Sequence, residues 1–369
     1  MSQLKNLTIR GFKSIETLDD FHLRKLNLII GANGAGKSNF VDFFRLLRAL
    51  ADGALQVFVN EQGGGDGFFF LGPKYTRQIY ARIEFGKNGY EFRLSPTAGS
   101  KIQVTEEWAG GESAQSPKFS IGSGSMESNL KSVANPESNP SLMKRVPAQV
   151  FDSLSSVTVY HFHDTSMLAP MRREHMARDN EYLRPDASNI GAFLTALRKA
   201  SPDGYQLIRD TVRLIAPFFD DFRLKPEDRG GNEMVRLEWR QIGSDFPFQP
   251  NHLSDGMIRF ICLTTALLQP NPPSTVVIDE PELGLHPFAL SVLADLIHSA
   301  AERTQVIVST QSPTLVDYFE PQDVIVVNRV NGRSEFTRLD PGQLKQWMDE
   351  YSLGELWQKN VVRAGPTHE

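Results

Sequence analysis

A glycine-rich loop, Gly31-Ala-Asn-Gly-Ala-Gly-Lys37-Ser38, is the stretch whose residue types and spacing best fit a chemical task. It matches the pattern G-x-x-x-x-G-K-[ST], in which backbone N–H groups turn inward around phosphate oxygens. Lys37 is expected to reach the β- and γ-phosphates of a nucleotide, and the Ser38 hydroxyl to hold Mg²⁺. A glycine-rich turn that matches by chance is the alternative. The predicted nucleotide-binding residues are Gly31, Ala32, Asn33, Gly34, Ala35, Gly36, Lys37, Ser38 and Asn39.

Two carboxylates follow the apolar stretch Val276-Val277-Ile278. Asp279 is placed to support Mg²⁺, as the aspartate at the end of such a strand does in phosphate-loop ATPases. Glu280 is one residue further and could polarise an attacking water as a general base. A strand ending in a solvated acidic turn is the alternative, which the phosphate loop in the same chain disfavours.

The stretch Leu253-Ser-Asp-Gly-Met257 opens a predicted helix. Ser254 fits an ordinary N-cap. It also fits the signature of ABC ATPases, in which a Ser hydroxyl, a Gly N–H and a helix N-terminus contact a γ-phosphate. Ser254 precedes Asp279 by 25 residues, comparable to the spacing in ABC ATPases, so the order of the three motifs favours the signature, with Ser254 and Gly256 as ATP contacts.

With these motifs, the chain resembles prokaryotic ABC-type ATPases of the RecF/SMC/OLD-like group. The resemblance rests on the three motifs and on further stretches that cover most of the chain outside residues 97–144. These stretches are Leu7-Thr-Ile-Arg-Gly-Phe-Lys-Ser14, Asp279-Glu-Pro-Glu-Leu-Gly-Leu-His-Pro287, Val306-Ile-Val-Ser-Thr-Gln-Ser-Pro313 and Glu350-Tyr-Ser-Leu-Gly-Glu-Leu-Trp-Gln-Lys-Asn360, the last resembling a subgroup of stand-alone ATPases.

The resemblance implies an ATP-driven homodimer, in which Ser254 and Gly256 of one copy complete the ATP site at Lys37 of the other. It places His286 near the dimer seam. The switch position, often His in the group, is Gln311, which can donate a hydrogen bond to a γ-phosphate but cannot titrate near neutral pH. Slow or partner-dependent hydrolysis is the expectation, with Glu280, Lys37 and Gln311 as catalytic residues.

Other residues leave alternatives open. Gln62 and Gln78 are both candidates for the glutamine of the group's Q-loop. His161 and His163 would share a face of a strand, but no further metal ligand is evident. Arg172-Arg173 fits a solvated charged surface better than a phosphate contact. Lys13 is a candidate nucleotide contact or a surface lysine.

The elements around the motifs predict an α/β fold of the ABC ATPase type: a mostly parallel sheet flanked by helices, an antiparallel β subdomain and a helical insertion. Predicted strands include 157–162, 222–224 and 234–239. The predicted divisions are an N-terminal ATPase lobe (1–96), a flexible insertion (97–144) for which a lid or partner-binding loop is the alternative, a central helical and β region (145–250), and a C-terminal ATPase lobe (251–369).

Composition narrows the class of protein. The 369 residues carry a formal net charge of -5, one cysteine (Cys262) and no apolar run long enough for a membrane helix. We therefore expect a cytoplasmic protein that does not enter the membrane. About 50 residues follow Gln311-Ser-Pro, which is short for a TOPRIM nuclease domain.

These observations predict a Mg²⁺-dependent ATPase that regulates a separately encoded effector, such as a nuclease, in anti-phage defence. An ATP-binding switch with negligible turnover and a DNA-repair ATPase that clamps DNA are the rival hypotheses, the second keeping DNA as a candidate partner. A transporter ATPase subunit fits the central region and tail less well.

Overall fold

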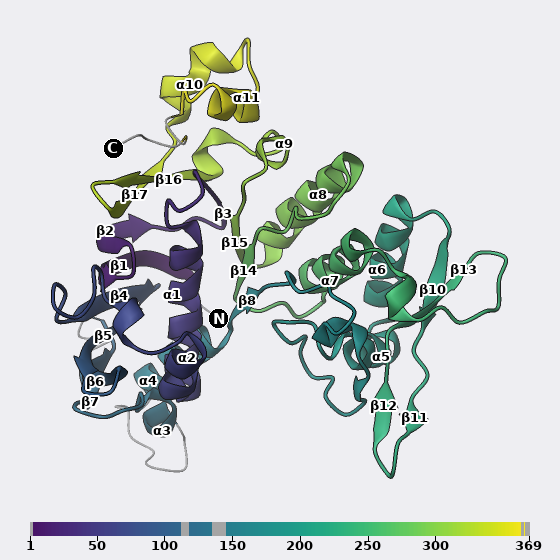
Figure 1. Ribbon diagram of the computed structural model, residues 1–369, viewed down its shortest axis with the longest axis horizontal. Coiled ribbons are helices and arrows are strands. Elements are labelled where there is room, and N and C mark those ends of the chain that lie inside the picture. The colour runs from purple at the N-terminus through teal and green to yellow at the C-terminus, as the bar shows by residue number, and fades with distance from the viewer. Residues whose placement is uncertain (1–2, 112–117, 135–144, 363–364, 366–369) are drawn as a thin grey trace.

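The computed structural model describes residues 3–111, 118–134, 145–362 and 365. Its N-terminal part is built on an antiparallel sheet with strand order β2-β1-β4-β5-β6-β7 (Figure 1). One face of this sheet is apolar and packs into a core with α1, whereas the other carries polar side chains. Its strands are β1 (Leu4–Phe12), β2 (Ile15–His22), β4 (Ile79–Phe85), β5 (Asn88–Thr97), β6 (Lys101–Ala109) and β7 (Phe119–Gly122).

The prediction of a flexible insertion over 97–144 is wrong for its described residues. β6 and β7 extend the antiparallel sheet, and Ile102 and Val104 are buried in its core. The sequence predicts a strand-like run only at Ile102–Thr105, whereas the structure extends it to the whole of β6 and adds β7. Residues 112–117 and 135–144, which belong to the same predicted insertion, lie outside the described residues.

A second sheet has the order β17-β16-β3-β15-β14-β8. All neighbours from β16 to β8 pair in parallel, and β17 is antiparallel to β16. This confirms the expected mostly parallel sheet. Its strands are β3 (Leu26–Ile30), β8 (Val157–Tyr160), β14 (Thr275–Asp279), β15 (Gln305–Ser309), β16 (Val324–Val330) and β17 (Arg333–Arg338).

The parallel sheet lies between two hydrophobic cores. In β14, Val276 and Ile278 belong to one core and Val277 to the other. Because successive side chains of a strand point to opposite faces, strands buried on both faces must be apolar throughout. This explains the apolar runs Leu28–Ile30, before the glycine loop, and Val276–Ile278, before Asp279 and Glu280.

Helices cover the two faces of this sheet. On the side of the antiparallel sheet lie α1 (Lys37–Asp52), α2 (Leu55–Glu61), α3 (Leu130–Ala134) and α4 (Arg145–Ser155). On the other side lie α5 (Ile190–Ala200), α6 (Pro202–Ile215), α7 (Asp255–Leu268) and α8 (Pro287–Arg303), and the chain ends in α9 (Pro313–Val316), α10 (Pro341–Met348) and α11 (Leu353–Gln358). The predicted boundary at 145 is therefore misplaced, since α4 packs with the first group and β8 belongs to the parallel sheet.

The strands of the central region also differ from those predicted from the sequence. The stretch 234–239, predicted as one strand, divides between two small sheets, and the strand predicted at 222–224 begins earlier. These sheets contain β10 (Phe219–Arg223) and β13 (Glu238–Gln241), and β9 (His175–Met176), β11 (Glu227–Asp228) and β12 (Glu233–Val235). They lie with α5 and α6 to the right in Figure 1, away from the antiparallel sheet. Across the described ranges, no helix is long and apolar enough to cross a membrane.

The segment before α3 fixes the start of α2, which gives a test of its structural role. The Glu127 carboxylate accepts hydrogen bonds from the N–H groups of Leu55 (2.6 Å) and Gln56 (3.0 Å). It supplies the cap that Ala54 cannot, since Ala has no polar side chain. Replacing Glu127 by Ala should lower the free energy of unfolding by about 1–2 kcal/mol. Urea denaturation measures this, with exposed Glu61→Ala on the same helix as the control, and an equal effect of both changes would contradict the capping role.

Candidate functional site

The carboxyl ends of four neighbouring parallel strands meet at one edge of the second sheet. β3 runs into the glycine loop, β14 ends at Asp279, β15 precedes Gln311, and β8 leads to His161 and His163. Since crevices at the carboxyl ends of such strands are where ligands bind in open α/β sheets, this edge is the candidate site.

The glycine loop is pressed against the β16–β17 hairpin and the turn after β1. A Cβ atom on Gly31 would lie 2.2 Å from the carbonyl oxygen of Val327. On Gly36, where φ is +112°, it would lie 2.0 Å from Ser334 Oγ and 2.6 Å from Ser14 Oγ. Both positions therefore require glycine because of backbone shape and close approach.

Lys37 lies buried at the base of the loop. Its Nζ donates to the carbonyl oxygens of Gly31 (2.8 Å) and Ala32 (3.1 Å). Burial lowers the pKa of Lys37, and the nearby carboxylates of Glu280 and Asp279 oppose that shift. The ammonium group stands at the N-terminus of α1, where an anion would meet both its charge and the helix dipole.

The remaining residues of the glycine loop differ in exposure and in hydrogen bonding. Asn33, Gly34 and Ser38 are exposed, whereas Ala35 is buried. Asn39, predicted as a nucleotide contact, donates from Nδ2 to Ser14 Oγ (2.7 Å). It also lines a cavity of about 360 Å³ beside the loop, together with Lys13, Ser14, Gly67, Phe70, Leu71, Arg329 and Gly332.

Lys13 lies next to the loop, as one of its two predicted roles requires. Its Nζ forms an ion pair with Asp42 (2.6 Å) and lies 5.3 Å from the ring centre of Phe68. Both the ion pair and the cation–π contact hold the ammonium in place within the wall of the cavity.

The two carboxylates at the end of β14, Asp279 and Glu280, have distinct partners. Asp279 accepts a hydrogen bond from the Ser309 hydroxyl, which the parallel register places beside it. Glu280 has a left-handed backbone (φ +45°) and accepts from the Gln311 side-chain amide. A non-glycine residue in that conformation is unusual and here turns the Glu280 side chain toward the switch residue. Gln311 and Glu280, predicted separately, therefore form one unit.

Glu282 belongs to the same cluster but was missed by the sequence analysis. Its Oε1 accepts from the backbone N–H of Gln311 (2.7 Å). Burial raises the pKa of Glu282, against the hydrogen bonds from Gln311 and Thr310. The only sequence signal for a role of Glu282 is its position two residues after Glu280. Its contact with Gln311 could not be predicted, because the two residues are far apart in the sequence.

Ser254 and Gly256 lie apart from the glycine loop. Ser254 caps α7, with its Oγ accepting from the N–H of Met257 (3.2 Å), so the N-cap role is confirmed. A Cβ atom on Gly256 would lie 2.3 Å from the carbonyl oxygen of Gly284. Within the described residues, no hydrogen bond joins Ser254 to the loop.

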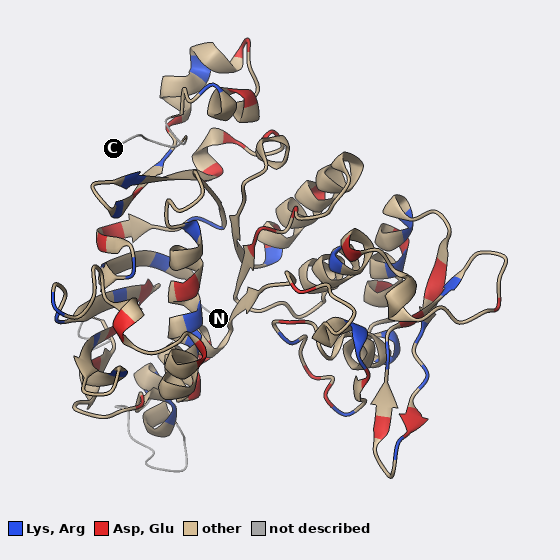
Figure 2. Ribbon diagram, in the orientation of Figure 1, with Lys and Arg blue, Asp and Glu red and all other residues tan. Residues whose placement is uncertain are grey.

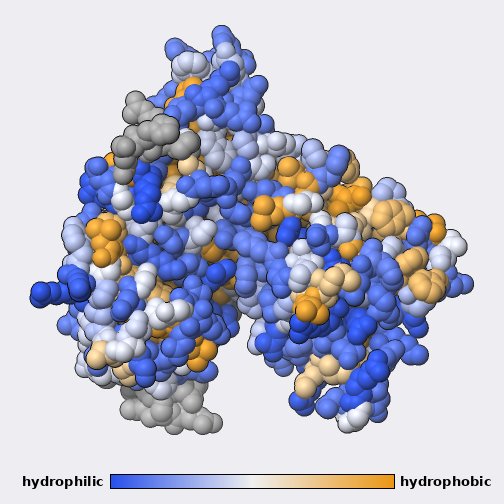
Figure 3. All heavy atoms as spheres, viewed as in Figure 1, coloured by the Kyte–Doolittle hydropathy of each residue, from blue (hydrophilic) through white to orange (hydrophobic). Residues whose placement is uncertain are grey.

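His286 caps α8, accepting from the N–H of Phe288 (3.3 Å), and shares a groove of about 320 Å³ with Ser254 and Gly256. The groove is mainly apolar, since its other lining residues are Ile215, Phe218, Met257, Gly284, Leu285, Phe288 and Ala289. Figure 3 shows apolar side chains gathered over α8 and α6, where Phe288 is 56% exposed and Phe218 46%.

His163, rather than either predicted glutamine, contacts the acidic cluster. Its Nε2 lies 2.9 Å from the carbonyl oxygen of Asp279. Of the two glutamines, Gln62 is the C-cap of α2, and Gln78 accepts a hydrogen bond from Arg93 of β5 (2.9 Å).

The two histidines after β8 were also weighed as metal ligands. The His161 and His163 rings are 6.4 Å apart, and among the described residues no group of three potential metal ligands occurs. β8 ends before both histidines, which corrects the predicted strand end at 162.

Two arginines fix the loops around the site. Arg172 is buried and donates to the carbonyl oxygen of Leu253 (3.1 Å) and to Asp255 Oδ1 (3.0 Å). The solvated surface predicted for Arg172-Arg173 is therefore correct only for Arg173, which is exposed. Arg259 of α7 donates to the carbonyl oxygens of Phe162 (2.9 Å) and Leu283, which joins the segment after β8 to the segment after β14.

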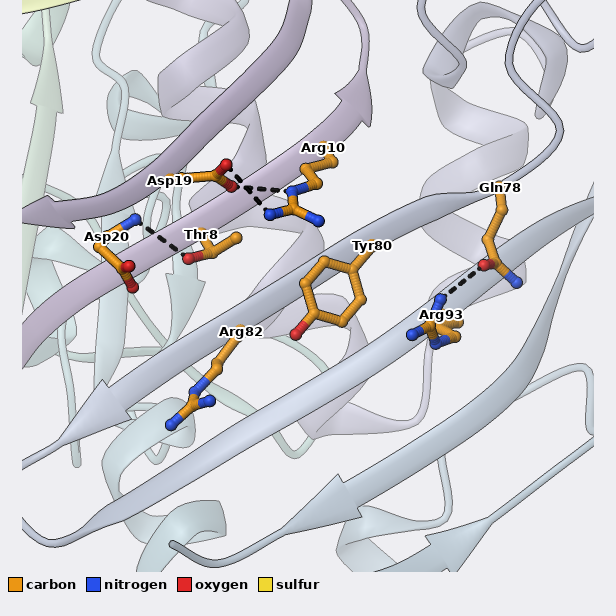
Figure 4. A pocket seen from close by; sticks show the side chains of 8 residues that line it. All are labelled: Thr8, Arg10, Asp19, Asp20, Gln78, Tyr80, Arg82 and Arg93. Carbon is orange, nitrogen blue, oxygen red and sulfur yellow. Dashed lines mark hydrogen bonds and ion pairs between the residues drawn. The ribbon is translucent and has the colours of Figure 1, made fainter. Parts of the chain in front are cut away.

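A cavity of about 530 Å³ lies on the polar face of the antiparallel sheet, remote from these loops (Figure 4). Arginines line it, but Arg10 pairs with Asp19 (2.8 Å), Arg82 with Glu84 (2.9 Å) and Arg93 with Glu106 (2.9 Å). Figure 2 likewise shows basic and acidic residues interspersed along the sheets and helices. This cavity therefore has the balanced charge of an ordinary polar surface.

Comparisons with known proteins agree with this architecture. The family model described as "AAA domain, putative AbiEii toxin, Type IV TA system" matches residues 26–317. A structure of an Smc head bound to the C-terminal winged-helix domain of ScpA has a TM-score of 0.63 and 16% identity, covering 92% of this chain and 99% of that one. An Smc head with an extended coiled coil, bound to the C-terminal domain of ScpA from Pyrococcus furiosus, has a TM-score of 0.55 and 16% identity, covering 95% and 99%. No curated protein matches the sequence significantly.

The raised pKa of Glu282 predicts a pH-dependent effect on stability. Burial disfavours its charged form, so Glu282 costs stability above its unfolded pKa and ceases to do so as pH falls below it. Glu282→Gln keeps an oxygen acceptor for the Gln311 N–H and removes the charge. The variant should melt at a higher temperature than the wild type at pH 8, and the difference should shrink toward pH 4. Calorimetry across this range measures it, and a constant difference would contradict the assignment.

Proposed function

The chain belongs to the family described as "AAA domain, putative AbiEii toxin, Type IV TA system" and has the fold of SMC-like ABC-type ATPases. From that premise we propose that it binds ATP with Mg²⁺ and hydrolyses ATP to ADP and phosphate. The observation that carries the proposal is the meeting of Lys37, Asp279, Glu280 and Gln311 at one sheet edge, with Glu280 and Gln311 in direct contact. These are the residue types that phosphoryl transfer to water requires.

Each residue has a role that follows from its surroundings. The backbone N–H groups of 31–36, with Lys37, bind the phosphates. Ser38 and Asp279 offer oxygen ligands, which suit Mg²⁺, and the metal would neutralise charge on the phosphates. Glu280 takes a proton from the attacking water. Gln311 orients the Glu280 carboxylate, to which its amide is bonded.

Replacing Glu280 by Gln tests the assignment of the general base. Loss of the base should lower kcat by a factor on the order of a hundred to ten thousand while ATP still binds. Steady-state phosphate release and binding of a fluorescent ATP analogue measure the two effects. Glu302→Gln is the matched control, the same change at an exposed position of α8 outside the site, and should keep the wild-type activity. An unchanged rate in Glu280→Gln would remove Glu280 as the base.

A second candidate is an ATP-binding switch with negligible turnover. It is favoured by the bond from Gln311 to Glu280, since that bond engages the proposed base, and Gln311 does not titrate near neutral pH. A wild-type rate no higher than that of Glu280→Gln, combined with tight ATP binding, would establish the switch over the enzyme.

The ATP site is completed by a second copy of the chain. Ser254 and Gly256 line a groove that the glycine loop does not share, and both lie at the N-terminus of α7, where a phosphate would be favourably placed. The apolar groove beside them, with exposed Phe218 and Phe288, supports a protein surface as its cover. We assign the cover to the face of the second copy that carries Lys37.

Replacing Ser254 by Arg tests the dimer. ATP should shift the Glu280→Gln protein from monomer to dimer in light scattering, because nucleotide is retained and both sites stay filled. A second change, Ser254→Arg, should abolish the shift by adding bulk and charge between the copies. Ser132→Arg on α3 is the control and should leave the shift intact. A mass that ignores ATP in the Glu280→Gln protein would contradict an ATP-driven dimer.

The ATP state is proposed to control a separately encoded effector in anti-phage defence. The family description names a putative toxin of a toxin–antitoxin system, and the Smc heads of similar fold are bound to ScpA domains in their structures. Co-expression with the product of an adjacent gene, followed by pull-down with ATP or ADP, tests this. Equal or absent capture in both states would count against control by nucleotide.

A further inference from the structure

The stretch from Glu350 to Asn360 has no role in the proposed ATP site, but it is capped, buried and packed against the rest of the fold. Its centre is α11, which Ser352 and Glu355 cap reciprocally. Leu353 and Leu356 are 1% and 0% exposed and belong to the same core as β14 and β15. This helix is therefore a fixed part of the ATPase fold rather than a loose end.

Gly354 brings α11 into backbone contact with α9. A Cβ atom on Gly354 would lie 2.3 Å from the carbonyl oxygen of Pro313 and 2.6 Å from Asp317 Oδ1. Its N–H donates to the same Asp317 oxygen at 2.6 Å. Any larger residue would push the two helices apart, since a backbone oxygen cannot rotate away as a side chain can.

α9 begins directly after the switch residue. The Ser312 hydroxyl caps it by accepting from the N–H of Leu315 (3.2 Å), and the Ser312 N–H donates to Thr310 Oγ1 (3.0 Å). Thr310 is held by the carbonyl oxygen of Ile29, next to the glycine loop (3.0 Å). Gln311 is thus placed between an anchor at the sheet and the N-terminus of α9.

We propose that α11 positions Gln311 for catalysis by holding α9, with Gly354 and Asp317 as positioning residues. The inference rests on the proposed function, in which the Gln311 amide orients Glu280. A shift of α9 would move the Gln311 backbone, whose N–H bonds to Glu282, and its side chain, which bonds to Glu280. Nucleotide binding at the glycine loop does not depend on this contact.

The primary test replaces Asp317 by Ala, which removes the acceptor for the Gly354 N–H at an exposed position. We expect kcat to fall on the order of ten- to a hundredfold, the size of effect that small misplacements have, with the dissociation constant for ATP unchanged. Asp317→Asn keeps an oxygen acceptor and should restore most of kcat. Gly354→Ala should act like Asp317→Ala, and Gly342→Ala on α10, where the nearest atom to a Cβ lies 3.3 Å away, is the matched control.

A double-mutant cycle with Gln311→Ala separates positioning from general destabilisation. If α11 acts through Gln311, Asp317→Ala should lower kcat in the wild-type background but cause no further loss beside Gln311→Ala. Equal losses in both backgrounds, or no loss in Asp317→Ala, would overturn the inference. The Gln311→Ala rate itself tests the proposed role of Gln311 separately.

Hydrogen exchange gives a readout that does not need turnover. The Gln311 and Leu315 amides should exchange faster in Asp317→Ala and Gly354→Ala than in the wild type or Gly342→Ala. Wild-type protein without ATPase activity would count against the proposed enzyme, whereas unchanged exchange at these amides would count against the positioning role of α11.

Discussion

Parallel pairing of β3, β15, β14 and β8 is the constraint on which the rest of the site depends. Parallel strands place their carboxyl ends at one edge of the sheet. The strand order alone therefore brings together residues that are far apart in the chain, such as Lys37, Asp279 and Gln311. Such strands require helices on both faces, and the strand side chains alternate between two cores accordingly. Each strand is apolar because the sheet is buried, and polar residues follow its carboxyl end because the chain leaves the core there.

The loops at this edge are held by long-range contacts rather than by their own conformational preferences. Ser334 Oγ forms hydrogen bonds with Ser14 Oγ and with the carbonyl oxygen of Ala35 (2.6 Å), which fixes the glycine loop against β17 and the turn after β1, two segments far apart in the chain. Arg259 similarly joins the segments after β8 and β14. For the proposed ATPase, a site fixed in this way would need little reorganisation to bind phosphate, which favours electrostatic stabilisation of the transition state.

The sequence alone was sufficient for features that a local pattern determines. The glycine loop, Asp279 and Glu280 are each recognisable within one strand and its following turn, and the parallel sheet follows from their apolar strands. The contacts of Glu282, Ser309 and His163 were not predicted because they form between segments that the strand pairing brings together, which no short stretch encodes. The strand β7 was missed because it has four residues and only one of them, Ile121, is a buried apolar residue, which gives no alternating pattern to recognise.

The three acidic residues at the end of β14 and just after it show how neighbouring side chains acquire separate partners. All three are close enough to buried Lys37 to act on its charge. Their partners differ: Asp279 has a hydroxyl donor, Glu280 a side-chain amide, and Glu282 a backbone N–H in a buried setting that raises its pKa. Glu282 thus holds the backbone of Gln311, while Glu280 receives that residue's side chain. Two carboxylates two residues apart therefore contact different groups of the same residue: the proposed general base Glu280 meets the side-chain amide of Gln311, and Glu282 meets its backbone N–H.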